Sequence, residues 1–350
     1  MKNRNFNYDL LRLLGLLIIM VAHSSPPGWL FQLRNFGTPL LVLGSGLTYS
    51  LIYSQRQIEA VSFLKKRLPK LILPAWIFLS FFFVCLYAAA TITNKDFPFK
   101  AQEVLTSYIF MEGIGFVWIF KIYLMLAIVT PIAIYLNNRC DSNLNYLAAL
   151  IAAYVVYELV LAAVDPLLAA SYKEYVDSII FTFIPYSLVY LYAFRLTKIS
   201  DKTIITAIVI SLVIFVVLAI VKYQQVGEVI STQKYKYPPT IYYLSYAFFA
   251  INTIYLCIRS IKISSITAQA IVTWLSSNSL WIYLWHIFAF YIWEFTSPME
   301  DGSFVNFIVK SVFLFGFGIS MTLIQNRIVF SIRWNNYHWN HRIVPLIASR

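Results

Sequence analysis

Arg12 and His23 are the two residues of the N-terminal apolar stretch whose side chains could do chemistry. Ten residues separate them, and eleven steps along an α-helix bring the two side chains to within about 20° of one face, about 16 Å apart along the axis. Ionisable groups inside membrane helices are costly and usually face a partner or a polar cavity. Because imidazole can accept a proton near neutral pH, this spacing predicts a general base that shares a helix face with a fixed positive charge.

Two other readings of the same residues stay open from the sequence. Asp9 lies three residues before Arg12, so a local ion pair could neutralise the guanidinium. His23 could also be an interfacial bystander. Pro26 and Pro27 follow closely, and a proline disfavours helical geometry in the residue before it. We therefore expect the first helix to end near His23, which would place the imidazole at the mouth of a polar cavity.

The composition identifies the elements that must position these residues. Hydrophobic residues make up 60% of the 350-residue chain and charged residues 12%, about half the charged share of an ordinary soluble domain. We predict an all-α integral membrane protein, a single domain over residues 1–350, with about ten transmembrane helices around a central polar cavity. The predicted spans are residues 8–25, 36–54, 71–93, 117–137, 144–164, 176–194, 203–221, 239–258, 271–293 and 304–326.

The distribution of charge predicts how the chain crosses the membrane. Of the 27 Lys and Arg residues, 17 fall in the two termini and in loops 55–70, 138–143, 195–202 and 259–270, and seven fall in the opposite loops. The positive-inside rule then predicts that both termini are cytoplasmic. We expect the protein in the plasma membrane, the inner membrane of a bacterium. The net charge of +12 follows this topology, so we expect membrane lipids and no nucleic acid as partners. The three scattered cysteines offer no metal-ligand spacing, and we expect no metal.

A basic cluster precedes the predicted third helix and ends at Arg67 and Lys70. Such a cluster could orient the helix and contact anionic lipid headgroups. It could equally hold the phosphates of a cytosolic substrate. Lys121 and Glu158, within predicted helices, could each belong to a bundle ion pair or contact a substrate.

The motifs at residues 8–46 resemble the opening of the acyltransferase family 3 membrane proteins. That family has an Arg, ten residues and a His in its first helix, then a Ser-Gly pair in its second. Here these are Arg12, His23 and Ser45-Gly46, although Gly44 stands where the family commonly has a bulkier residue. Later segments are similar in the same order: Lys66-Arg67 with Lys70 and Pro74; Trp118 with Tyr123 and Pro131; and Ser279, Tyr283 and His286.

The resemblance implies transfer of an acyl group, usually acetyl, from cytosolic acyl-CoA to a hydroxyl of an extracytoplasmic polysaccharide or lipid-linked sugar. It implies His23 as general base, Arg12 at the thioester, and Arg67 and Lys70 at the CoA phosphates. Acetyl-CoA would be a co-substrate, with no permanently bound cofactor. The remaining expected substrate contacts are Asp9, Ser45, Trp118, Lys121, Tyr123, Tyr283 and His286. Aromatic neighbours in the sequence also suit His286 to the role of a hydrogen-bonded core histidine.

Other function classes remain as alternatives. A transporter or flippase could use the same buried Arg and His, but it would favour paired, Gly- or Pro-interrupted helices in two matching halves, and the sequence has none. A membrane acyltransferase of another family would lack the spacing of Arg12 and His23. For a membrane scaffold without chemistry, the intramembrane Arg would be an unexplained cost. The oligomeric state is not specified by the sequence.

Overall fold

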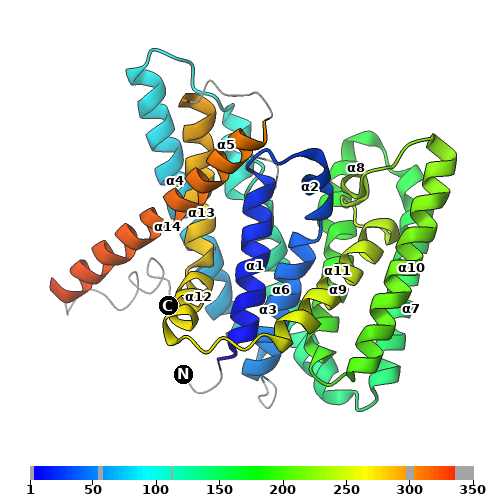
Figure 1. Ribbon diagram of the computed structural model, residues 1–350. Coiled ribbons are helices and arrows are strands. Elements are labelled where there is room, and N and C mark those ends of the chain that lie inside the picture. The colour runs from blue at the N-terminus through cyan, green and yellow to red at the C-terminus, as the bar shows by residue number, and fades with distance from the viewer. Residues whose placement is uncertain (1–3, 54–57, 112, 297–302, 336–350) are drawn as a thin grey trace. The chain divides into compact units, whose positions relative to one another are not determined.

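The computed structural model describes residues 4–53, 58–111, 113–296 and 303–335, and these residues form helices and their connections without a strand (Figure 1). Eight helices in this part of the chain are long and apolar enough to cross a membrane. The two other predicted spans correspond to α1 (Phe6–Ala22), of 17 residues, and α13 (Ser279–Thr296), of 18. The eight are Gly28–Tyr53, Ala60–Ile92, Trp118–Arg139, Asn143–Leu167, Ala170–Leu196, Asp201–Val226, Ile241–Ser260 and Phe304–Ser331.

The chain divides into two compact units, each described here by itself. Unit 1 comprises residues 1–22, 27–58 and 129–276, and unit 2 comprises residues 23–26, 59–128 and 277–350. The division falls directly after α1, so Arg12 belongs to unit 1 and His23 to unit 2.

Unit 1 is built around α1, α3 (Gly37–Tyr53) and α9 (Thr182–Leu196), with α3 packed on both of the others. Small residues allow these close approaches: a Cβ atom at Gly15 would lie 2.8 Å from the Leu41 side chain. A hydrogen bond from Ser50 Oγ to the Phe194 carbonyl, 3.0 Å long, joins α3 to α9. The same unit holds α2 (Gly28–Leu33), α8 (Ala170–Val176), α11 (Ile241–Ser260), α12 (Ile266–Ser277), the short helix η3 (Thr232–Tyr235) and the second half of α6 (Trp118–Arg139).

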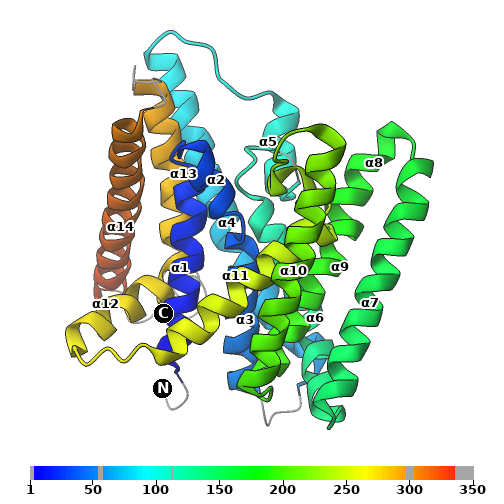
Figure 2. The same cartoon turned by 45° about the vertical axis from the view of Figure 1, so that its right-hand side comes forward.

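Two helices of unit 1 expose apolar surface on nearly every side. In the most apolar stretch of α7 (Asn143–Val164) only 11% of the residues are buried, and in that of α10 (Asp201–Val226) only 6%. In a membrane protein such surface faces lipid. Ser200 caps the start of α10 by accepting from the Thr203 N–H, and Gly227, at φ 81°, ends it. Figure 2 shows α10 running alongside α11.

Unit 2 contains α4 (Ala60–Ile92), α5 (Ala101–Tyr108), the first part of α6, α13 and α14 (Phe304–Asn335). The Trp285 indole N–H donates to Gln325 Oε1 at 2.7 Å, which ties α13 to α14. The predicted start of the third span at residue 71 is wrong as a helix boundary, because α4 begins at Ala60. Lys and Arg are good helix formers, so the basic cluster extends the helix beyond its apolar part. The predicted span 271–293 is also wrong, because α12 and α13 are separate helices that meet at Asn278.

Candidate active site

His23 directly follows α1 and lies against His286 of α13, both within unit 2. His23 Nδ1 is 2.8 Å from His286 Nε2, a hydrogen-bonding distance. The two rings are stacked, with centroids 5.1 Å apart and planes 12° from parallel. His286 is fully buried, whereas His23 is half-buried. The expectation that His286 is a hydrogen-bonded core histidine is therefore confirmed, and its partner is the predicted base.

The hydrogen bonds of His286 determine which nitrogen of each ring carries a proton. His286 Nδ1 contacts the carbonyl oxygen of Tyr283, one turn earlier on α13. A carbonyl only accepts hydrogen bonds, so Nδ1 of a neutral His286 carries the proton and Nε2 carries the lone pair. His23 Nδ1 must then donate to His286 Nε2. This arrangement leaves the basic lone pair of His23 on its Nε2 atom.

Aromatic groups surround the two histidines. The edge of the Phe116 ring meets the His23 ring at a centroid distance of 4.6 Å. The Tyr283 hydroxyl donates to the Phe116 carbonyl oxygen at 2.6 Å and so fixes this segment on α13. Phe116 was not predicted from the sequence. The available signal was its neighbourhood, because Gly113 and Gly115 both adopt positive φ, at 50° and 74°, and shape the turn before α6.

A buried lysine holds the segment that carries His23. Lys310 of α14 is 4% exposed, donates to Glu294 Oε1 at 2.6 Å, and also donates to Ser25 Oγ at 3.2 Å. Ser25 has φ of 56°, an uncommon conformation for a residue other than glycine. The lysine therefore stabilises a strained backbone two residues after His23, a role that the sequence did not reveal.

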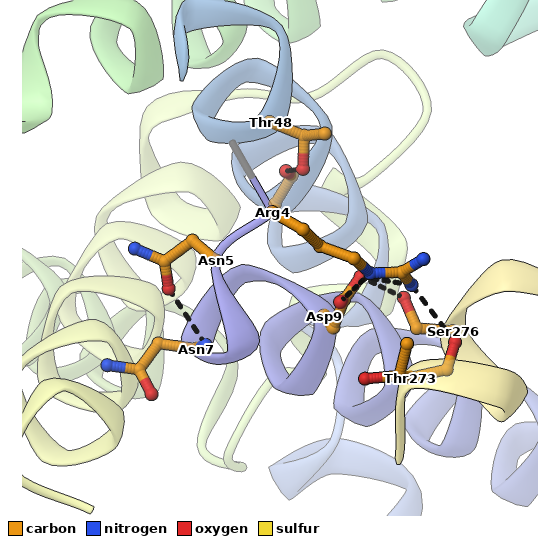
Figure 3. Close-up of polar contacts among 8 residues, drawn as sticks. Arg4, Asn5, Asn7, Asp9, Thr48, Thr273 and Ser276 are labelled. Carbon is orange, nitrogen blue, oxygen red and sulfur yellow. Dashed lines mark hydrogen bonds and ion pairs between the residues drawn. The ribbon is translucent and has the colours of Figure 1, made fainter. Parts of the chain in front are cut away.

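Asp9 pairs with Arg4, as Figure 3 shows. Arg4 Nη2 donates to Asp9 Oδ1 at 3.0 Å, and the Ser276 hydroxyl donates to the same oxygen at 2.9 Å. The alternative of a local pair between Asp9 and Arg12 is wrong. Because α1 begins at Phe6, Arg4 lies in the segment before the helix and can fold back onto the carboxylate. Arg12 has no hydrogen bond or ion pair with any residue that the structure describes.

Gly44 makes room for Arg12 within unit 1. A Cβ atom at Gly44 would lie 3.0 Å from Arg12 Cγ, closer than most side chains tolerate. The residue before the Ser-Gly pair is thus small because the aliphatic part of Arg12 passes directly over it. Ser45, next on α3, is 9% exposed.

The sequence model of the acyltransferase 3 family, described as an acyltransferase domain, matches residues 5–325 of the chain. The chain belongs to the acyltransferase 3 family. The family resemblance seen at residues 8–286 is confirmed, and with it the assignment as a membrane acyltransferase. Searches of curated proteins and of solved structures gave no match.

The other predicted site residues of this acyltransferase 3 protein are spread over both units. His23, Tyr283 and His286 meet in unit 2, whereas Arg12 belongs to unit 1. Glu158 of α7 accepts a hydrogen bond from Tyr154, one turn earlier. Within the described ranges, no group of three or more His, Cys, Asp or Glu side chains could hold a metal ion. Of the remaining predicted residues, Asp9 and Ser45 lie in unit 1, and unit 2 holds half-buried Arg67, exposed Lys70 and half-buried Trp118, Lys121 and Tyr123.

Proposed function

We propose that the protein transfers an acetyl group from cytosolic acetyl-CoA to a hydroxyl of an extracytoplasmic glycan or lipid-linked sugar. The observation that carries the proposal is the hydrogen-bonded sequence from His23 to His286 to the Tyr283 carbonyl in an acyltransferase 3 protein. A base oriented by a second, buried group is what proton removal from a sugar hydroxyl requires.

The reaction follows from the protonation of the two rings. The acceptor oxygen attacks the thioester carbonyl carbon while His23 Nε2 takes the hydroxyl proton. As His23 becomes an imidazolium, His286 Nε2 accepts a charge-assisted hydrogen bond from its Nδ1–H. The tetrahedral intermediate then collapses, the carbon–sulfur bond breaks, and the CoA sulfur receives the proton from His23. The products are the acetyl ester and CoA thiol, and His23 returns to its starting state.

The proposal assigns separate roles to the cations. Arg12 is assigned to the thioester end of acyl-CoA, as the family resemblance implies, and it forms no ion pair with a described carboxylate. Arg67 and Lys70, on the basic lead of α4, suit the phosphates of CoA. This assignment uses the predicted topology, with cytoplasmic termini in a bacterial inner membrane.

The test uses purified protein in liposomes with acetyl-labelled CoA and an external glycan acceptor. Free CoA thiol and labelled glycan are measured together, and empty liposomes serve as the control. We expect one thiol released for each acetyl group found on the glycan. Longer acyl-CoAs, supplied in parallel, test the preference for acetyl. Transport of substrate without release of CoA would refute the proposal in favour of a transporter.

A further inference from the structure

Two buried cations of unit 1 lie near one another, in the segments that follow α2 and η3. Arg34, at the end of α2, is 8% exposed, and Lys236, after η3, is 6% exposed. Their segments are fastened together by two side-chain hydrogen bonds: Ser231 Oγ donates to Gln32 Oε1 at 2.6 Å, and Asn35 Nδ2 donates to Thr232 Oγ1 at 2.9 Å. The fold thus holds two positive side chains in one region of unit 1.

The surroundings of these cations are aromatic. The Arg34 guanidinium lies 3.9 Å from the centroid of the Phe31 ring, and Lys236 Nζ lies 5.1 Å from that of Tyr237. No ion pair joins Arg34 to a carboxylate of the described residues. Burial, and then repulsion from Arg34, lowers the pKa of Lys236 to about 7. Burial of the Arg34 guanidinium is costly unless an anion compensates it.

Several buried polar atoms of the same region also have no hydrogen-bond partner within the described structure. One is a donor, Arg34 Nε. The others are acceptors that a hydroxyl could satisfy: Asn35 Oδ1, Gln233 Oε1 and Thr240 Oγ1. Buried polar atoms in folded proteins are nearly always paired with protein, water or a ligand, so this group can provide hydrogen bonds to a bound molecule. A ligand that satisfies all of them carries both an anionic group and hydroxyls.

Arg195 of the same unit shows how a structural buried arginine is accommodated. It is 1% exposed, and its guanidinium donates to the carbonyl oxygens of Asn137, Cys140 and Asp141 and to Asn143 Oδ1, over distances of 2.6–3.2 Å. These bonds close the end of α6 and the turn that follows. Among the described residues Arg34 has no comparable set of acceptors, so hydrogen bonding within this part of the fold does not account for its burial.

We propose that Arg34 and Lys236 bind the anionic group, a carboxylate or phosphate, of an acidic sugar, and that this sugar belongs to the acceptor. The assignment to the acceptor rests on the proposed function, in which the segments that carry Arg34 and Lys236 face the extracytoplasmic side. The carboxylate or phosphate receives charge-assisted hydrogen bonds from the two cations. The sugar hydroxyls donate to the acceptors beside them, which gives preference for a sugar over a simple anion.

Direct binding tests the site without acetyl-CoA. Glucuronate, glucose 6-phosphate, inorganic phosphate and neutral glucose are titrated into the purified protein in detergent, and into Arg34→Gln, Lys236→Gln and Lys234→Gln. Lys234 is the matched control, because it is an exposed lysine of η3, two residues before Lys236. We expect an acidic sugar to bind more tightly than phosphate or glucose. Each buried-site variant should weaken its binding by at least about tenfold, and the control should leave it unchanged.

Thermal melting separates a ligand site from a structural role. Without ligand, Arg34→Gln should melt at a higher temperature than the wild type, because one of two repelling buried charges is gone. A lower melting temperature would indicate a structural role and overturn the proposal. Equal binding of acidic sugars by the wild type and both buried-site variants would also overturn it. If phosphatidylglycerol stabilises the protein and acidic sugars do not, the site binds a lipid headgroup and the proposal is overturned.

The two proposals can fail separately. Acidic sugar binding that depends on Arg34, without any acetyl transfer, would keep this site and refute the proposed function. Acetyl transfer to acidic glycans that is unaffected by Arg34→Gln and Lys236→Gln would keep the function and refute the site.

Discussion

The hydrogen bond between the two histidines should contribute measurably to catalysis. In His286→Phe, a ring remains to stack on His23, but the acceptor at 2.8 Å from His23 Nδ1 is lost. When His23 becomes charged in the transition state, a hydrogen bond to a charged group contributes about 1.5–3 kcal/mol. At about 1.4 kcal/mol for each factor of ten, kcat should fall by roughly 10- to 150-fold. The KM for acetyl-CoA should stay unchanged, because the lost interaction strengthens only as the proton moves.

The assay is the rate of CoA thiol release in liposomes at saturating acetyl-CoA, with thermal melting to verify folding. His286→Gln is the matched variant, since its amide oxygen can accept from His23 and should restore part of the rate. A His286→Phe variant that keeps at least half of the wild-type kcat would refute a catalytic contribution of this hydrogen bond. It is also refuted if the Gln variant is no faster than the Phe variant, because the acceptor would then be irrelevant.

Three further predictions concern the cations. Replacing Arg67 and Lys70 by Ala should raise the KM for acetyl-CoA by at least about tenfold, whereas replacing the two exposed lysines just before them should not; an unchanged KM with poor expression would mark the cluster as a topology signal. Gly44→Val should displace Arg12, because even a Cβ would lie 3.0 Å from Arg12 Cγ, and kcat should fall with a lowered melting temperature; wild-type kcat would contradict the packing. The unfolded chain should bind a proton at Lys236 more tightly than the folded protein does, since burial lowers the folded pKa to about 7 against about 10.4 when unfolded. The stability of the folded protein should therefore rise with pH between these two pKa values. In Lys236→Gln, melting curves at the same pH values should lack this rise. Identical pH profiles of the wild type and the variant would refute the lowered pKa of Lys236.

The sequence predicted most of the membrane helices because their lengths are set by the apolar interior of the bilayer. The prediction from sequence failed at helix ends that extend beyond the apolar layer. Hydropathy registers the apolar part of α4 but not the basic turns from Ala60 that continue the same helix. It also joined α12 and α13, because the separation at Asn278 is a local backbone change between two apolar stretches.

The candidate site was predictable in its residue types and not in its contacts. The spacing of Arg12 and His23 predicted His23 as the base, and the family resemblance pointed to Tyr283 and His286. The contact between His23 and His286 joins residues 263 positions apart, so it depends on tertiary packing that no local pattern encodes. Asp9 had charged neighbours on both sides in the sequence, and only the start of α1 at Phe6 decides in favour of Arg4.

His23 as the general base is tested by the single-turnover rate of acetyl transfer in His23→Ala, measured together with thermal stability and acetyl-CoA binding. His23→Ala removes the hydrogen-bond donor to the buried His286 Nε2, so stability should fall by about 1–3 kcal/mol, whereas acetyl-CoA binding should stay close to the wild type. Loss of a general base should lower the rate by a factor of about 10²–10⁴. A variant that keeps more than about a tenth of the wild-type rate would fall outside that range and contradict the assignment of His23 as the base.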